Sequence, residues 1–171
     1  MSLELSKESK KRIEQALERY PQKQAALLPI LHIVQEELGY VPEDAEADIA
    51  AIVEIPVVKV REVLSFYTLY LRKPVGKYHL QLCRTISCTL RGHRDILKCV
   101  EEKLGIKDGE TTADGKFTLS TVECLASCET APMMQLNETY HGNLTPEKID
   151  EILVSLNGKK REVKHGWARD N

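Results

Sequence analysis

Apolar residues recur at helical spacing through residues 1–70 of the chain. The clearest run places them at i, i+4, i+7 and i+11, and its members are Leu27, Leu31, Val34 and Leu38. Gly39 follows at the position where a helix commonly ends in the left-handed conformation. Pro29 either opens this helix or kinks it. Three further helices are expected at residues 6–18, between Pro42 and Pro56, and after Pro56.

After Gly76 the pattern becomes one that is typical of a sheet covered by helices. Tyr78, Leu80 and Leu82 alternate with polar residues and predict a strand that ends at Cys83. The later elements are expected to be a helix over residues 89–104, strands over 117–123 and 132–137, and a helix that begins at Thr145-Pro146-Glu147. The order strand, helix, strand, strand, helix predicts a small α/β layer that resembles thioredoxin-like architecture.

The two patterns together predict an α+β protein with two domains and a tail. An N-terminal helical bundle is expected at residues 1–73, and a thioredoxin-like α/β domain at residues 74–157. Residues 158–171 carry five Lys or Arg residues against two acidic ones. A frayed terminus and a docking arm both fit such a tail.

Composition narrows the classes of protein that fit this pattern. The 171 residues are 42% apolar and 29% charged, which excludes a disordered or low-complexity chain. The formal net charge of −2 provides no field that would attract nucleic acid or an anionic membrane. No apolar run approaches the roughly 18 residues of a membrane-spanning helix, and the N-terminus has no signal-peptide core. We therefore expect a cytoplasmic protein with no nucleic-acid partner and no direct membrane insertion.

Five cysteines are the exception in this otherwise ordinary composition. Cys83 and Cys88 form a C-x4-C pair, and Cys124 and Cys128 form a C-x3-C pair. Each pair lies where a predicted strand ends, so both pairs are expected on loops at the same edge of the sheet. Cytosolic thiols are kept reduced, and grouped cysteines there indicate ligands or redox groups rather than structural disulfides.

The spacing leaves more than one bound group open. Zinc is commonly held by two cysteine pairs, although these pairs are wide for it. A two-iron, two-sulfur (2Fe–2S) cluster suits wider loops, while none of the five histidines stands in the C-x-H arrangement of a Rieske centre. A reversible disulfide between Cys83 and Cys88 leaves the second pair without a purpose. Arg84, the hydroxyls of Thr85 and Ser87, and a helix start at Cys88 favour a polyanionic centre.

Several other residues have an ordinary structural interpretation that outweighs a functional one. Cys99 belongs to neither pair and is expected to be a half-buried, inert thiol. His93 is expected to pack against the apolar side of its helix, and Met133 and Met134 are expected to fill the core beneath the second loop. An interdomain core is expected to include the aromatic residues Phe66, Tyr67 and Tyr70.

Four segments of the chain resemble a known family: LPILHIVQEELGYVP, SFYTLY, GKYHLQLCRTISCTLRG and TTADGKFTLSTVECLASCETAPMMQLN. They are similar to the E-type subunit of NADH–quinone oxidoreductase, the small iron–sulfur subunit of respiratory complex I, over residues 20–156. The resemblance implies a thioredoxin-like ferredoxin domain whose 2Fe–2S cluster is held by Cys83, Cys88, Cys124 and Cys128. Cys99 matches no ligand position. Ala126 departs from the family, which often has glycine there, and alanine disfavours a positive φ.

The resemblance also implies an electron-transfer role within a larger enzyme. The family's partner is a flavoprotein, the F-type subunit, which carries FMN, the NADH site and a four-iron cluster. This chain has no G-x-G-x-x-G motif after a strand, so no hydride-transfer site is expected on it. Through the complex it would lie on the cytoplasmic side of the inner membrane. The alternatives are a structural zinc-binding module, or the equivalent subunit of an NAD-linked hydrogenase or formate dehydrogenase.

Overall fold

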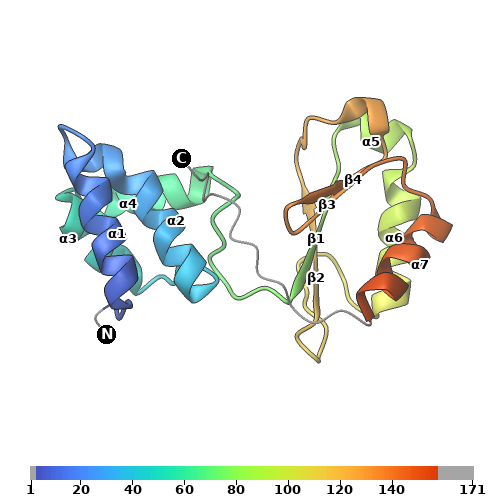
Figure 1. Ribbon diagram of the computed structural model, residues 1–171. Coiled ribbons are helices and arrows are strands. Elements are labelled where there is room, and N and C mark those ends of the chain that lie inside the picture. The colour runs from blue at the N-terminus through green and yellow to red at the C-terminus, as the bar shows by residue number, and fades with distance from the viewer. Residues whose placement is uncertain (1–2, 158–171) are drawn as a thin grey trace. The chain divides into compact units, whose positions relative to one another are not determined.

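The computed structural model describes residues 3–157, and the predicted basic tail lies outside them. The chain divides into two compact units, Met1–Pro74 and Val75–Asn171 (Figure 1). Each unit has a hydrophobic core of its own among the described residues. Across residues 3–157, every helix is too short or too polar to cross a membrane.

The first unit is helical. Its elements are α1 (Lys7–Glu18), the 3-10 helix η1 (Lys23–Ala26), α2 (Leu27–Leu38), α3 (Ala45–Val53) and α4 (Val57–Phe66). The Ser6 side chain caps α1 by accepting a hydrogen bond from the Ser9 N–H. Gly39 ends α2 with a φ of 82°, which glycine adopts without strain. The four helices predicted in this region are therefore confirmed.

Pro29 opens α2 rather than kinking it. It is the third residue of that helix, in the first turn, where backbone N–H groups have no partner within the helix. A proline at this position therefore costs no hydrogen bond. The predicted apolar face of α2 is largely buried in the core of the unit, together with residues of α3 and α4.

The second unit is a four-stranded sheet with helices on one face. Its elements are β1 (Tyr78–Cys83), α5 (Ile86–Leu90), α6 (His93–Leu104), β2 (Phe117–Val122), the 3-10 helix η2 (Cys128–Thr130), β3 (Met134–Leu136), β4 (Thr139–His141) and α7 (Pro146–Asn157). The strand order is β2-β1-β3-β4. β1 and β2 are parallel, whereas β3 is antiparallel to both β1 and β4.

The alternation predicted for β1 decides which face of this sheet is covered. Tyr78, Leu80 and Leu82 are buried with apolar residues of α6 and α7, which contact each other (Figure 1). The opposite face is polar, and on it the His79 Nε2 lies 2.8 Å from the Ser120 Oγ. Burial of apolar area on one face is the main force that holds the helices on the sheet.

Two elements of this unit differ from the sequence-based prediction. The single helix expected over residues 89–104 is wrong, because Gly92 has a φ of 97° and separates α5 from α6. Strand β4 was not predicted. It forms a hairpin with β3 through Asn137, which has a φ of 51°, and asparagine is one of the few residues that tolerate this region. The mixed helix-and-sheet composition is confirmed.

Candidate functional site

The parallel pairing of β1 and β2 brings the two cysteine pairs to one edge of the sheet. Cys83 is the last residue of β1 and lies opposite Val122, the last residue of β2. Cys124 follows only two residues later. The carboxyl ends of parallel neighbouring strands meet at the same edge, so the expected common edge is confirmed.

The first cysteine pair is buried. Cys83 is 4% exposed and Cys88 is 2% exposed, and both pack with Ala131 and Met133 in a small apolar cluster. Cys88 lies in the first turn of helix α5, so the predicted helix start near this cysteine is confirmed, whereas the expectation that it lies on a loop is wrong. The tight connection after β1 turns the chain directly into this short helix. As a result, the helix directs Cys88 into the same cluster as Cys83.

Hydrogen bonds and burial act in opposite directions on these two thiols. Burial alone would raise the pKa of Cys83, but hydrogen bonds from the side chain and backbone of Thr85, and from the backbone of Leu125, lower that pKa. The Thr85 Oγ1 lies 3.2 Å from the Cys83 Sγ. Burial raises the pKa of Cys88, and the nearby Cys83 and Cys128 raise it further. Cys88 therefore interacts with thiols from both pairs.

The second cysteine pair lies in an exposed, irregular segment. Cys124 and Cys128 are both exposed, and Cys128 is the first residue of η2. Between them, Ala126 has a φ of 56°, in the left-handed region that alanine rarely adopts. The Ala126 N–H points at the Cys124 Sγ, with a nitrogen–sulfur distance of 3.3 Å. Ala126 therefore adopts the conformation for which glycine is the usual residue.

An ion pair joins the two cysteine-bearing segments. Arg84 directly follows Cys83, and Glu123 directly precedes Cys124. The Arg84 Nε donates to the Glu123 Oε1 over 2.9 Å, and the Arg84 Nη2 donates to the same oxygen. Glu123 was not singled out from the sequence. The signal available was its position beside a cysteine at the end of one parallel strand, with a basic residue beside the cysteine of the other.

His93 and Cys99 lie where the sequence predicts. His93 is buried at the start of α6, and burial lowers the pKa of its imidazole. Cys99 packs as a partly buried side chain against the sheet core, and burial raises the pKa of its thiol. A thiol held in its protonated form is a poor ligand and a poor nucleophile. Met133 and Met134 are both buried, which confirms their expected core positions.

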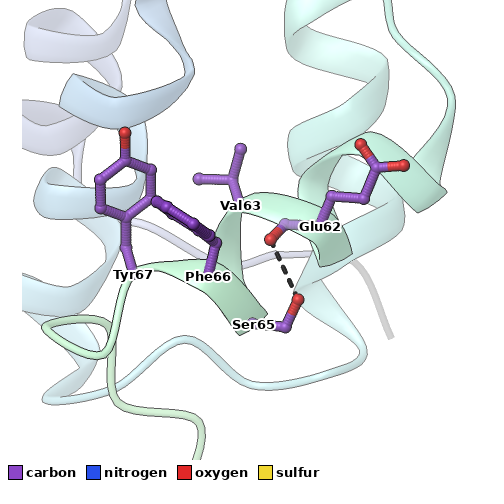
Figure 2. A pocket seen from close by; sticks show the side chains of 5 residues that line it. All are labelled: Glu62, Val63, Ser65, Phe66 and Tyr67. Carbon is purple, nitrogen blue, oxygen red and sulfur yellow. Dashed lines mark hydrogen bonds between the residues drawn. The ribbon is translucent and has the colours of Figure 1, made fainter. Parts of the chain in front are cut away.

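The aromatic residues of the helical unit do not share one core. Tyr70 is buried and its hydroxyl donates to the Leu28 carbonyl over 3.0 Å, whereas Phe66 is 77% exposed. Figure 2 shows Phe66 and Tyr67 beside an open pocket of this unit. The residues that line it are Glu62, Val63, Ser65, Phe66 and Tyr67. Tyr70 belongs to the core of its own unit, and the expected interdomain aromatic core stays a prediction.

The donor set at the sheet edge fits an iron–sulfur group in its chemistry. Four thiols, backbone N–H groups directed at the Cys83 and Cys124 sulfurs, and a threonine hydroxyl beside the Cys83 sulfur are features that stabilise thiolates bound to iron. Within residues 3–157, no three His, Cys, Asp or Glu side chains are already arranged around a single metal-ion position.

Comparison with known proteins decides the family. The family model described as "Thioredoxin-like [2Fe-2S] ferredoxin" matches residues 13–157. The chain belongs to this family. A curated relative, an E-type subunit of NADH-quinone oxidoreductase from Rhizobium meliloti (strain 1021), is 46% identical over 87% of this chain and 89% of its own length. The E-type subunit from Rickettsia bellii (strain RML369-C) is 44% identical over 84% of this chain and 87% of its own. The resemblance to the E-type subunit is confirmed.

A solved structure has a related fold. A chain of an NAD+-reducing [NiFe]-hydrogenase in the H2-reduced state superposes with a TM-score of 0.66 at 19% sequence identity. The match covers 78% of this chain but only 22% of the hydrogenase chain. At this identity the likeness concerns the fold alone. The thioredoxin-like ferredoxin fold expected from the sequence is confirmed by the family match.

Proposed function

We propose that this chain is the electron-transfer subunit of an NADH–quinone oxidoreductase and carries one 2Fe–2S cluster. Its proposed ligands are Cys83, Cys88, Cys124 and Cys128. The observation that carries the proposal is the meeting of two cysteine pairs at one sheet edge, in a chain 46% identical to an E-type subunit of that enzyme. The chain is thus a subunit of an oxidoreductase rather than an independent enzyme.

The chain's own residues divide the work at this site. When bound, a 2Fe–2S cluster takes up and releases one electron at a time. Cys83 and Cys88 anchor the buried side of the site, where Thr85 hydrogen-bonds the Cys83 sulfur. Cys124 and Cys128 hold the exposed side, and the Ala126 N–H offsets charge on the Cys124 sulfur. Hydrogen bonds to sulfur and access of solvent are the means by which a protein sets the potential of such a group.

The electron source in this proposal is a separate flavoprotein. The family resemblance implies that the NADH site, the FMN and a four-iron cluster belong to the partner flavoprotein, the F-type subunit, and the lack of a nucleotide-binding glycine motif in this chain fits that arrangement. The exposure of Cys124 and Cys128 supports an approach by that partner at the sheet edge. The complex would hold the chain on the cytoplasmic side of the inner membrane. The shared core of α1 to α4 supports the assignment of residues 1–73 as a helical bundle.

The alternatives receive less support. The hydrogenase likeness, at 19% identity, concerns the fold and does not favour that parent complex over a quinone reductase. A formate dehydrogenase has no specific observation in its favour. A structural zinc site disagrees with membership of a 2Fe–2S ferredoxin family.

Visible spectroscopy of the purified protein tests the cofactor and its ligands together. We expect a red-brown protein whose charge-transfer bands bleach on reduction. Separate changes of Cys83, Cys88, Cys124 and Cys128 to Ala should each abolish these bands, whereas Cys99→Ala should retain the wild-type iron content as the matched control. A colourless, fully zinc-loaded protein would contradict the proposed cofactor. Loss of iron in Cys99→Ala would contradict the ligand assignment.

A further inference from the structure

We propose that Arg84 and Glu123 are positioning residues that clamp the two cysteine-bearing segments together. The proposal rests on the proposed function, because it concerns retention of the group that the four cysteines hold. Neither residue is a ligand, and both side chains are more than half exposed. Their role follows from their position, because they join the segment that follows β1 to the segment that follows β2.

The ion pair extends the pairing of β1 and β2 beyond the last strand residues. The regular register ends at Cys83 opposite Val122. The Arg84 N–H then donates to the Val122 carbonyl over 2.9 Å. Two nitrogens of the Arg84 side chain also reach a single oxygen of Glu123. The main chain and the side chain of Arg84 therefore bind two consecutive residues of the other segment, Val122 and Glu123.

The second segment needs such a tie because its other described hydrogen bonds are mostly local. The Ala126 N–H reaches Cys124, and the Ser127 and Thr130 hydroxyls lie 2.8 Å apart. These contacts shape the segment. At its far end the Asn143 N–H donates to the Thr130 carbonyl over 2.5 Å and fixes η2 to the loop before α7, which leaves the part around Cys124 with fewer contacts to the rest of the unit. A hydrogen bond from the Leu125 backbone to Cys83 crosses between the segments, but it involves a proposed ligand sulfur. The Arg84–Glu123 pair is a crossing contact that leaves all four sulfurs available.

The strength of this clamp is modest and depends on salt. An exposed ion pair changes an equilibrium by about twofold to fivefold, and a pair in which one guanidinium makes two hydrogen bonds lies at the upper end. Solvent ions screen exposed charges, so the contribution should shrink at high ionic strength. The clamp should therefore slow the opening of the site without deciding whether the unit folds.

Loss of iron to a chelator measures this opening directly. The variants are Arg84→Ala, Glu123→Ala and the double variant, each purified with its iron. We expect each single variant to lose its visible absorbance about two- to fivefold faster than wild type in excess EDTA at low salt. The double variant should be no faster than the faster single variant, because either change alone already removes the pair.

Matched controls come from the same unit. Lys98 and Glu102 form an exposed i,i+4 pair in α6, with a nitrogen–oxygen distance of 3.8 Å. Lys98→Ala and Glu102→Ala therefore make the same charge changes away from the cysteine segments, and we expect wild-type rates of iron loss. High salt should accelerate iron loss from the wild type and leave the rates of the Arg84 and Glu123 variants nearly unchanged.

The reduction potential separates positioning from simple charge effects. A positive charge near a redox centre favours the reduced form, and a negative charge disfavours it. Arg84→Ala should therefore lower the potential and Glu123→Ala should raise it, while both accelerate iron loss. Opposite shifts in potential combined with the same change in chelation rate are the signature of a clamp.

The outcomes distinguish this inference from the function on which it rests. A wild-type protein that binds no iron–sulfur group would overturn the proposed function. An iron-loaded wild type whose Arg84 and Glu123 variants lose iron no faster than the Lys98 and Glu102 controls would overturn the clamp alone. Rates that move in opposite directions in the two single variants, or that multiply in the double variant, would also overturn it. Arg84→Lys keeps the positive charge but lacks the planar guanidinium that donates two hydrogen bonds. It should therefore retain iron less well than the wild type but better than Arg84→Ala.

Discussion

The two cysteine-bearing segments, residues 83–90 and 123–130, carry the ligands of one proposed site but differ in their structure. The first segment continues from β1 into helix α5, and both of its cysteines are buried. The second segment is irregular up to η2, and both of its cysteines are exposed. One side of the site is therefore held by the buried packing of the unit. The other side is exposed and is held by a few hydrogen bonds and an ion pair.

The position of each strand in the sheet explains this difference. β1 lies between β2 and β3, so the residues at its end have neighbours on both sides. β2 is an edge strand with β1 as its neighbour in the sheet. An edge position leaves the segment after β2 open to solvent and free of packing on one side. A partner protein can approach the exposed side, while the buried side keeps its geometry.

Removal of the packing beneath the first segment should cause the largest loss of unfolding free energy. Met133 is 2% exposed and packs against Cys83 and Cys88. Met133→Ala should lower the free energy of unfolding by about 2–5 kcal/mol, because it removes buried methylene groups and leaves a cavity. Urea unfolding measures this loss, and release of iron to a chelator should become faster in the same variant.

Met134→Ala is the matched control for that change. Met134 is fully buried but belongs to the core between the sheet and its helices. We expect a similar loss of unfolding free energy with a smaller acceleration of iron release. If both variants released iron equally fast, the special support of the first segment by Met133 would be contradicted.

A substitution that crowds the second segment should cause an intermediate loss of unfolding free energy. A Cβ at Gly142 would overlap the Cβ of Thr130, the last residue of η2. Gly142→Ala should therefore displace Thr130 and cost about 1–3 kcal/mol of unfolding free energy. Thermal or urea unfolding measures the cost, and iron release reports the displacement near Cys128.

Gly76→Ala provides a comparable clash at the opposite end of the strands. Its Cβ would lie 2.9 Å from backbone carbons of Lys116 and Phe117, before and at the start of β2. We expect it to destabilise the unit without accelerating iron release beyond what the lost stability explains. Equal acceleration in both variants would show that η2 is not specifically coupled to the site.

The smallest effect should come from relief of strain at Ala126. Ala126→Gly removes the unfavourable contact of Cβ at a φ of 56°, and it should raise the free energy of unfolding by about 1 kcal/mol or less. Ala51→Gly is the control, because Ala51 is exposed within helix α3. There the same substitution should destabilise by about 0.5–1 kcal/mol. If both substitutions changed the free energy of unfolding in the same direction in a urea titration, the strain at Ala126 would be contradicted.

Local signals in the sequence predicted most of the elements. Ser6, Gly39 and the Thr145-Pro146 step mark helix ends through hydrogen bonds and φ preferences that need no tertiary partner. The division of residues 89–104 into two helices was missed, because Gly92 lies in an otherwise continuous helical pattern. Strand β4 was missed because three residues carry too little alternation to predict a strand.

For the site, the spacing of the cysteines and the ends of the predicted strands sufficed to place both pairs at one edge. The sequence also identified Arg84 as a positive charge beside the first pair. It did not reveal that Glu123 would meet Arg84, because that contact depends on the parallel register of β1 and β2. The positive φ of Ala126 was signalled by its departure from the family's usual glycine.

The sequence by itself determined most of the helices and strands, the two cysteine pairs and the family. These features depend on spacing and local preference, which act between residues close in the chain. Only the tertiary structure decided that one pair is buried and the other exposed, and that an ion pair ties the two segments. Alternation of apolar and polar residues indicates that one face of a strand packs on a core, but it does not indicate which strands lie beside it. Burial and crossing contacts follow from those neighbours.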